Sequence, residues 1–225
     1  MERLYVYGII GDADIRCGPI HGHGGAEVFA FRHNNIAGVV SDARCLPLEP
    51  SVENVWRHER VLGALTERHA VLPMRFGTAC EAGELFALLE MRRSAIYDGL
   101  GRVAGRVEVA VRISDKAPAS PPKPDRCSGE GAGTAYLMAR LEDRGQSAAV
   151  ERIRIRLSRL SEESIWDDGA GTTRGIKGSC LIGRKSVAEF ADAVGGLARA
   201  NPDVAVSCTG PWTPYSFVGG LAAGD

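Results

Sequence analysis

The sequence contains no run of apolar residues approaching the roughly 20 that a membrane-spanning helix needs. Its first residues do not form a signal peptide either. The apolar segment Leu4–Ile10 is short, follows the acidic Glu2, and is followed at once by Gly11 and Asp12. This pattern is typical of a first β-strand. We therefore expect no membrane interaction and predict a cytoplasmic protein.

The sequence also lacks an excess of basic residues and any pair of closely spaced cysteines. It has 27 Lys and Arg against 28 Asp and Glu, so nothing indicates the electrostatic attraction on which nucleic-acid binding depends. The one dense basic run, four arginines between positions 152 and 159, is balanced by nearby carboxylates and is typical of a solvated face. The six cysteines, at positions 17, 45, 80, 127, 180 and 208, never form a Cys-x-x-Cys pair. This scattering argues against a disulfide framework or a zinc site and indicates free thiols in a reducing compartment.

Motifs for cofactors and metals are incomplete. The glycine-rich segment Gly129–Thr134 precedes a predicted helix, but it lacks the Gly-Lys-Ser/Thr of a phosphate-binding loop and follows a proline-rich stretch instead of a strand. Cys17, His21 and His23 could supply ligands to zinc or copper, yet no fourth ligand is indicated. We predict neither a cofactor nor a metal.

Candidate catalytic groups gather around one predicted helix. His58 and His69 flank its second half, with Glu59 and Glu67 nearby and Arg75 after it, so a general acid–base site could be assembled from them. However, no serine or cysteine stands in a recognisable nucleophile elbow, and packing or capping explains the histidines. We predict no catalytic residues.

The first part of the chain predicts an α+β domain over residues 1–101. Asn34 and Asn35 tolerate the left-handed backbone of a tight turn, so the strands on either side should form an antiparallel hairpin. Ser51 can cap the first helix, whose apolar residues recur at helical spacing. The expected elements are strands at 4–10, 26–32 and 36–41, a helix at 51–68, a further strand, and a helix at 81–100.

The second part predicts a ferredoxin-like domain over residues 102–210. Its expected order is β-α-β-β-α-β, the split β-α-β arrangement of an antiparallel sheet with two helices on one face. The elements are strands at 103–113, 163–167, 178–183 and 204–208 and helices at 134–160 and 186–199, with a loop rich in Pro and Gly at 114–133. Residues 152–157 also alternate as a strand would, but Val150, Ile153, Leu157 and Leu160 fit a helical stripe, so we favour a helix.

Residues 211–225 form the predicted C-terminal arm. Pro211 and Pro214 remove backbone donors, so the strand ladder should stop and the chain should continue as an extended, polyproline-like segment. Trp212, Tyr215 and Phe217 would together cost several kcal/mol if left in water, so they should dock in a groove. The groove belongs either to this chain, which makes the arm a clasp, or to a partner.

Two segments resemble a known family. Gly210–Val218, with the letters G-P-W-T-P-Y-S-F-V, resembles the C-terminal signature of the gas vesicle protein L/F family, in which proline is common at the position of Thr213. The earlier segment Leu72–Thr78, L-P-M-R-F-G-T, is similar to a second block of that family, with Met74 in place of a common leucine. Such an exchange conserves volume.

The resemblance implies two α+β domains, the second of modified ferredoxin-like type with a variable insertion. It also implies a non-enzymatic accessory factor of gas vesicle formation that binds the hydrophobic shell protein and other assembly proteins and that could stay in the vesicle as a minor component. Which surface holds the shell protein, and whether the chain is of L type or F type, stays open. The residues that would carry the role are the arm residues Pro211, Trp212, Pro214, Tyr215 and Phe217 and the domain-junction residues Leu72, Pro73, Arg75, Phe76 and Gly77. The alternatives are a ferredoxin-like enzyme and a ligand-sensing module, because this fold carries unrelated functions in other families.

Overall fold

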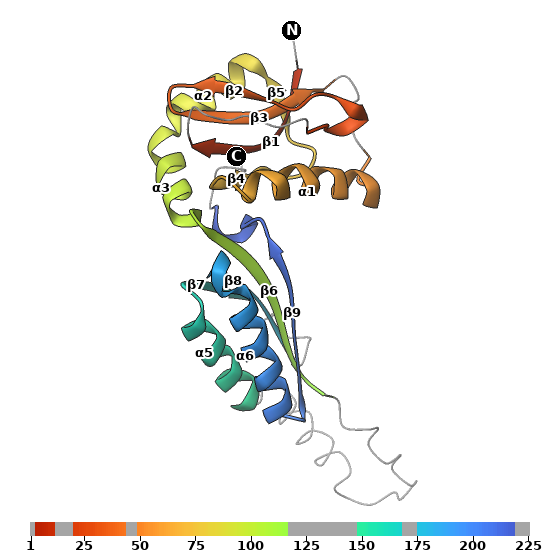
Figure 1. The fold of residues 1–225 in the computed structure, drawn as a ribbon, viewed down its shortest axis with the longest axis vertical. Coiled ribbons are helices and arrows are strands. Elements are labelled where there is room, and N and C mark those ends of the chain that lie inside the picture. The colour runs from red at the N-terminus through yellow and green to blue at the C-terminus, as the bar shows by residue number, and fades with distance from the viewer. Residues whose placement is uncertain (1–2, 12–19, 44–48, 117–147, 168–174, 219–225) are drawn as a thin grey trace, which may run out of the picture. The chain divides into compact units, whose positions relative to one another are not determined.

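The computed structural model describes residues 3–11, 20–43, 49–116, 148–167 and 175–218 (Figure 1). These residues divide into two compact units. Unit 1 comprises residues 1–108 together with 211–225, and unit 2 comprises residues 109–210. The chain therefore leaves unit 1 once and returns to it, so unit 2 is an insertion in unit 1. The described part of the predicted arm groups with unit 1.

Unit 1 is organised around the strand β1 (Arg3–Gly11). Its neighbours are β3 (Ile36–Asp42) on one side and, on the other, first β5 (Ala79–Glu81) and then β4 (Val71–Pro73), all antiparallel to it. The strand β2 (Phe29–His33) pairs with β3 and forms the edge of the sheet. Residues 4–10 of β1 are buried without alternation, as expected for a central strand covered on both faces.

Three helices cover this sheet. α1 (Val52–Thr66) lies along one face, and α2 (Ala82–Met91) lies along the other (Figure 1). The predicted helix at 81–100 is wrong as one element, because Arg92 leaves helical geometry with φ −102° and ψ 14°, and α3 (Arg93–Val103) starts after it. The hairpin between β2 and β3 is confirmed, with Asn34 at φ 52°. As predicted, Ser51 caps α1 by accepting a hydrogen bond from the backbone N–H of Asn54.

Unit 2 contains a four-stranded sheet in the order β7-β8-β6-β9. Its elements, in chain order, are β6 (Arg106–Asp115), α5 (Ala148–Leu160), β7 (Glu163–Asp167), β8 (Gly175–Gly183), α6 (Val187–Ala200) and β9 (Val204–Trp212). Both helices lie side by side on one face of the sheet (Figure 1). Val109, Val111 and Ile113 of β6 point into the core beneath them, and residues 152–157 are helical, as we favoured.

The prediction for the C-terminal segment is wrong in two respects. β9 does not stop before Pro211 but continues to Trp212. Pro211 is tolerated there because β9 is an edge strand, where a missing N–H need not interrupt the ladder. Beyond it the chain does not stay extended, since Tyr215–Phe217 form a turn of 3-10 helix, η3. Two further 3-10 turns are η1 (His23–Gly25) and η2 (Arg184–Ser186).

Several predictions lie outside the described residues: most of the 114–133 loop, the helix over 134–147, the glycine-rich segment at 129–134, and Cys17. Helices and strands in two antiparallel sheets confirm the α+β class. No helix in the described ranges has both the length and the apolarity that crossing a bilayer requires.

Candidate functional site

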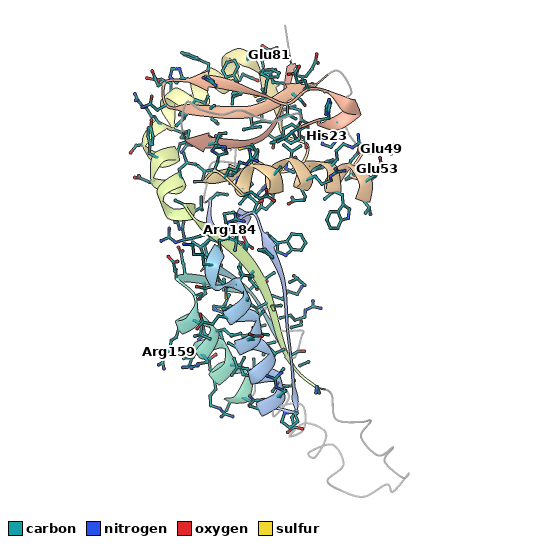
Figure 2. The ribbon with its side chains drawn as sticks, viewed as in Figure 1. His23, Glu49, Glu53, Glu81, Arg159 and Arg184 are labelled. Carbon is teal, nitrogen blue, oxygen red and sulfur yellow. The ribbon has the colours of Figure 1, made fainter. Side chains whose placement is uncertain are left out.

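A cluster of aromatic and imidazole rings fills the space between the sheet of unit 1 and α1. Tyr5 and Tyr7 come from β1, His58 from α1, His23 from η1, and Phe76 from the turn after β4. The ring centres of Tyr5 and His23 are 4.7 Å apart, and those of Tyr7 and His58 are 5.4 Å apart. Tyr5, Tyr7, His23 and His58 are each at most 5% exposed, and Figure 2 shows His23 between the sheet and α1.

His58 forms the centre of a hydrogen-bond chain. Its Nε2 lies 3.1 Å from the carbonyl oxygen of Met74, so this nitrogen carries the hydrogen and donates. Its Nδ1 then accepts from the Tyr5 hydroxyl at 2.9 Å, and that hydroxyl accepts from the backbone N–H of Gly77 at 3.1 Å. Burial lowers the pKa of His58 to about 4 and raises the pKa of Tyr5. The imidazole is therefore neutral, and both its nitrogens are used to hold β1, α1 and the turn after β4 together.

His23 is placed differently. Its backbone N–H donates to the Tyr7 hydroxyl at 3.1 Å, but neither ring nitrogen has a hydrogen-bond partner within the described residues. Burial is the main cause that lowers the pKa of His23. The nearby Arg57 charge acts in the same direction, whereas the Asn54 amide raises the pKa. His21 is exposed, so its side chain and that of His23 have different environments, and the part of the chain that the structure describes holds no metal-binding group of three residues.

The segment Leu72–Thr78 joins two short strands that both pair with β1. Leu72 and Pro73 are buried in β4, where Pro73 lies opposite Gly8. The turn that follows is closed by a hydrogen bond from the N–H of Thr78 to the carbonyl of Arg75, with Gly77 at φ 86°. A side chain at such a φ is strained, which accounts for glycine here. Phe76 joins the ring cluster while Arg75 points to solvent, so this block shapes the edge of the sheet.

The C-terminal segment packs on unit 1 through four side chains. Tyr215 donates to the Glu59 carboxylate of α1 at 2.6 Å, and the Thr213 hydroxyl lies 3.3 Å from that of Thr66. Burial raises the pKa of Tyr215, and the hydrogen bond to Glu59 adds to this effect. Burial also raises the pKa of Glu59 itself, against the opposing effect of that hydrogen bond.

The end of this segment is held by α3 and β6. Phe217 is 1% exposed, and its carbonyl accepts from Arg102 of α3 at 2.9 Å. Glu108 of β6 accepts from both the N–H and the hydroxyl of Ser216, at 2.9 and 2.7 Å. A carboxylate at the start of a helical turn satisfies N–H groups that have no partner within the turn.

The five predicted arm residues thus occupy two environments. Pro214, Tyr215 and Phe217 are buried or half-buried in unit 1, whereas Pro211 and Trp212 are exposed, Trp212 by 39%. The structure does not bring the predicted acid–base candidates together, since His58 belongs to the ring cluster, Glu59 binds Tyr215, and Arg75 is exposed. Sequence analysis missed Tyr5 and Tyr7. Their alternation within an otherwise apolar strand was a signal, because buried tyrosine hydroxyls need polar partners.

Known proteins resemble this chain both in fold and in sequence. The crystal structure of the gas vesicle protein GvpF from Anabaena sp. PCC7120 superimposes with a TM-score of 0.75 at 21% identity, covering 97% of this chain and 96% of that one. The chain therefore has the fold of that α+β protein. Gas vesicle protein F2 of Halobacterium salinarum is 31% identical over 223 residues, which cover 96% of this chain and 92% of that protein. Gas vesicle protein F of Haloferax mediterranei is 30% identical over 96% of this chain and 93% of its own.

The family model described as "Gas vesicle synthesis protein GvpL/GvpF" matches residues 3–219. The chain belongs to this family, as the resemblance of its two sequence blocks predicted, and its role lies in gas vesicle formation.

Proposed function

We propose that this chain is a non-enzymatic accessory protein that binds the hydrophobic shell protein and other assembly proteins while gas vesicles form, and that it remains with the vesicle as a minor component. The observation that carries the proposal is the family match over residues 3–219, which spans nearly the whole chain. We further propose that the chain works in the cytoplasm and at the vesicle, and that unit 2 is a ferredoxin-like domain, consistent with its β-α-β-β-α-β order within the described residues.

The hydrogen bonds of the His58 imidazole support a binding role over a catalytic one. A general base needs a free lone pair near the surface at working pH. His58 accepts from Tyr5 and donates to Met74, and it is fully buried. Its two nitrogens are therefore committed to holding the fold of unit 1.

We propose the edge strand β2 as the surface that takes the shell protein. Edge strands offer unpaired backbone groups to which an extended segment can add, and neighbouring side chains supply the specificity. β2 lies at the end of the strand order, Phe29 on it is 42% exposed, and Phe86 of α2 is 48% exposed. The rings of His33, on β2, and Phe86 meet edge to face with their centres 4.5 Å apart, so Phe86 lies beside this edge strand. A subunit that builds an apolar wall needs such a surface before assembly.

The C-terminal aromatics have a different role in this proposal. Tyr215 and Phe217 act as a clasp within the same chain, supported by their hydrogen bonds to Glu59 and Arg102. Leu72–Gly77 keeps its predicted part as a junction block. Its Met74 carbonyl accepts from His58 of α1, and the clasp contacts the same helix at Glu59. Of the three arm aromatics, only Trp212 is exposed enough to contact a partner directly.

The test is a pull-down of the major shell protein by the purified chain and by three variants. Phe29→Ser with Phe86→Ser should abolish capture while the circular dichroism spectrum is unchanged, because both side chains are exposed. The matched control, Ile155→Ser with Ile165→Ser, removes two exposed apolar side chains from unit 2, 39% and 43% exposed, and should bind normally. Failure of the unmodified chain to capture shell protein would refute the binding role, and full capture by the Phe29/Phe86 variant would refute the surface. Loss of capture by Trp212→Ala alone would move the site to the end of β9.

A further inference from the structure

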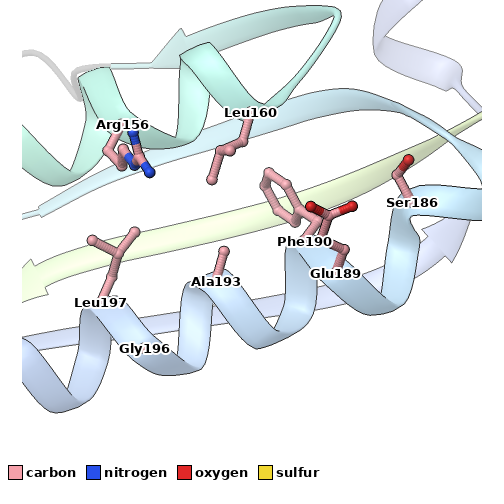
Figure 3. Close-up of a pocket in the computed structure, with 8 residues that line it drawn as sticks. All are labelled: Arg156, Leu160, Ser186, Glu189, Phe190, Ala193, Gly196 and Leu197. Carbon is pink, nitrogen blue, oxygen red and sulfur yellow. The ribbon is translucent and has the colours of Figure 1, made fainter.

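A groove runs between the two helices of unit 2. It has a volume of about 450 Å³, and six of its eight lining residues come from α6 and from Ser186, the residue just before it (Figure 3). These positions, Ser186, Glu189, Phe190, Ala193, Gly196 and Leu197, recur every three or four residues and follow one side of α6. Eleven residues of helix extend about 16 Å, or three turns. The groove therefore has the length of a short helical segment.

The floor of this groove is apolar and its two ends carry opposite charges. Leu160 of α5 and Phe190 form the middle, while Arg156 lies beside Leu197 at one end and Glu189 lies at the other (Figure 3). Among the described residues, neither Arg156 nor Glu189 makes a hydrogen bond or ion pair. By contrast, Arg154, which lies on α5 as Arg156 does, pairs with Glu151. Two opposite charges are thus available to a segment laid along the groove.

The groove is also accessible to a second backbone. A Cβ atom added at Gly196 would meet nothing within 4 Å, and Ala193 one turn earlier has only a methyl group. Small residues on a helix let another helix approach closely, since packed helices lie about 8–10 Å apart.

Unit 1 exposes a helical stripe of matching character. Val52, Val55 and Trp56 of α1 are 75%, 38% and 56% exposed, and their spacing of three and four residues places them on one side of the helix. Tyr215 covers the same side one turn further along, at Glu59, but leaves these three open. An exposed tryptophan beside two valines is typical of the apolar centre of an interface.

Charges flank this stripe in the order that the groove requires. Glu53, near the start of α1 (Figure 2), and Arg60, seven residues later, lie beside Trp56 and about 10 Å apart along the axis. The groove has a similar separation of opposite charges. Arg156 lies next to Leu197, and Leu197 is eight residues, or about 12 Å, from Glu189 along α6. Glu53 already pairs with Arg57, and a carboxylate can accept from a second guanidinium.

We propose that α1 of one copy of this chain binds in the α5/α6 groove of a second copy. α1 lies antiparallel to α6, with Glu53 against Arg156 of the second copy and Arg60 against its Glu189. The contact joins different surfaces of the two copies, so an assembly that does not close into a ring keeps a free stripe at one end and a free groove at the other, and it can continue head to tail.

The test is analytical ultracentrifugation of the full chain and of variants over a range of concentrations. Trp56→Glu removes the centre of the stripe, and Gly196→Gln fills the groove at a helical position where a side chain meets open space. Each alone should weaken self-association at least about tenfold, as truncation of a central interface residue does. Ala191→Gln is the matched control, because Ala191 is exposed on α6 but does not line the groove.

Mixing the two variants gives the decisive result. The Trp56→Glu copy keeps an intact groove and the Gly196→Gln copy keeps an intact stripe, so together they should form one-to-one dimers and nothing larger. High salt should weaken this dimer because its flanking ion pairs are exposed. An unmodified chain that stays monomeric at all concentrations, self-association that neither variant alters, or a mixture that fails to pair would each overturn the proposal. Circular dichroism of each variant separates these results from loss of fold.

Discussion

Mild acid should destabilise unit 1 through the burial of His58. In the unfolded chain this imidazole has the ordinary pKa of 6.5, whereas in the folded chain the pKa is about 4. The unfolded state therefore binds a proton first as the pH falls, so the stabilisation that is fully present above pH 6.5 is lost between about 6.5 and 4. At about 1.4 kcal/mol per pH unit, the whole difference corresponds to about 3 kcal/mol, and about 2 kcal/mol is already lost at pH 5.

Other charged groups around His58 modify this effect without reversing it. The pKa of His23 in the same cluster is also lowered, chiefly by burial, so His23 adds a loss of the same sign. Glu59 on α1 has a raised pKa and therefore opposes the loss, because its folded form takes up a proton more readily. A variant that removes only His58 should consequently keep a reduced dependence on pH.

The assay is urea unfolding at pH 7 and pH 5, with hydrogen exchange by mass spectrometry reading peptides of α1 separately from those of unit 2. His58→Gln can still donate to the Met74 carbonyl but does not titrate. Between the two pH values it should lose about 2 kcal/mol less free energy of unfolding than the unmodified chain. His21→Gln, which changes an exposed histidine of the same unit, serves as the control and should behave as the unmodified chain does. An equal loss in His58→Gln and in the unmodified chain would refute the assignment of the acid sensitivity to this buried imidazole.

Three further changes should alter stability in defined ways. Tyr215→Phe leaves the half-buried carboxylate of Glu59 without its hydroxyl donor and should cost about 1–3 kcal/mol in urea unfolding; an unchanged midpoint would mean that solvent replaces the bond. Gly178→Ala places a Cβ too close to the ring of Trp166, its partner across β7 and β8, and should shift the tryptophan emission and lower the melting temperature of unit 2; an unaltered spectrum would contradict the close packing. Ser51→Ala removes the cap of α1 and should cost about 1 kcal/mol, whereas Ser51→Asp, which retains a cap, should cost much less.

The sequence predicted most elements correctly where periodicity and turn chemistry agree. The Asn34 turn, the Ser51 cap and the β7 strand were readable because each depends on residues within a few positions of one another. The break at Arg92 was not readable, since nothing in the surrounding residues interrupts the apolar pattern that joins α2 to α3. β5 was missed for a related reason: three residues are too few to show a period, and their pairing with β1 is set by the turn at Gly77.

The site was only partly predictable because its contacts connect distant parts of the chain. The two sequence blocks that resemble the family identified Phe76, Tyr215 and Phe217, but their partners Tyr5, Glu59 and Arg102 lie up to 156 positions away. No local pattern indicates which carboxylate a tyrosine will bind. The effect of Pro211 was also misjudged, because an edge position removes the penalty that proline carries inside a sheet.

The return of the chain to unit 1 after unit 2 has a consequence for synthesis on the ribosome. Residues 3–108 emerge early, but the side chains that cover Glu59, Thr66 and Arg102 are made only after all of unit 2. Until Phe217 has left the exit tunnel, the nascent unit 1 exposes the surface on which Tyr215 and Phe217 later pack, so only a chain translated to this point can finish folding. A product that ends within unit 2 would carry an uncovered α1 and be an early substrate for chaperones or proteases. The contacts of Thr213, Tyr215 and Phe217 thus complete unit 1 only after unit 2 has been made.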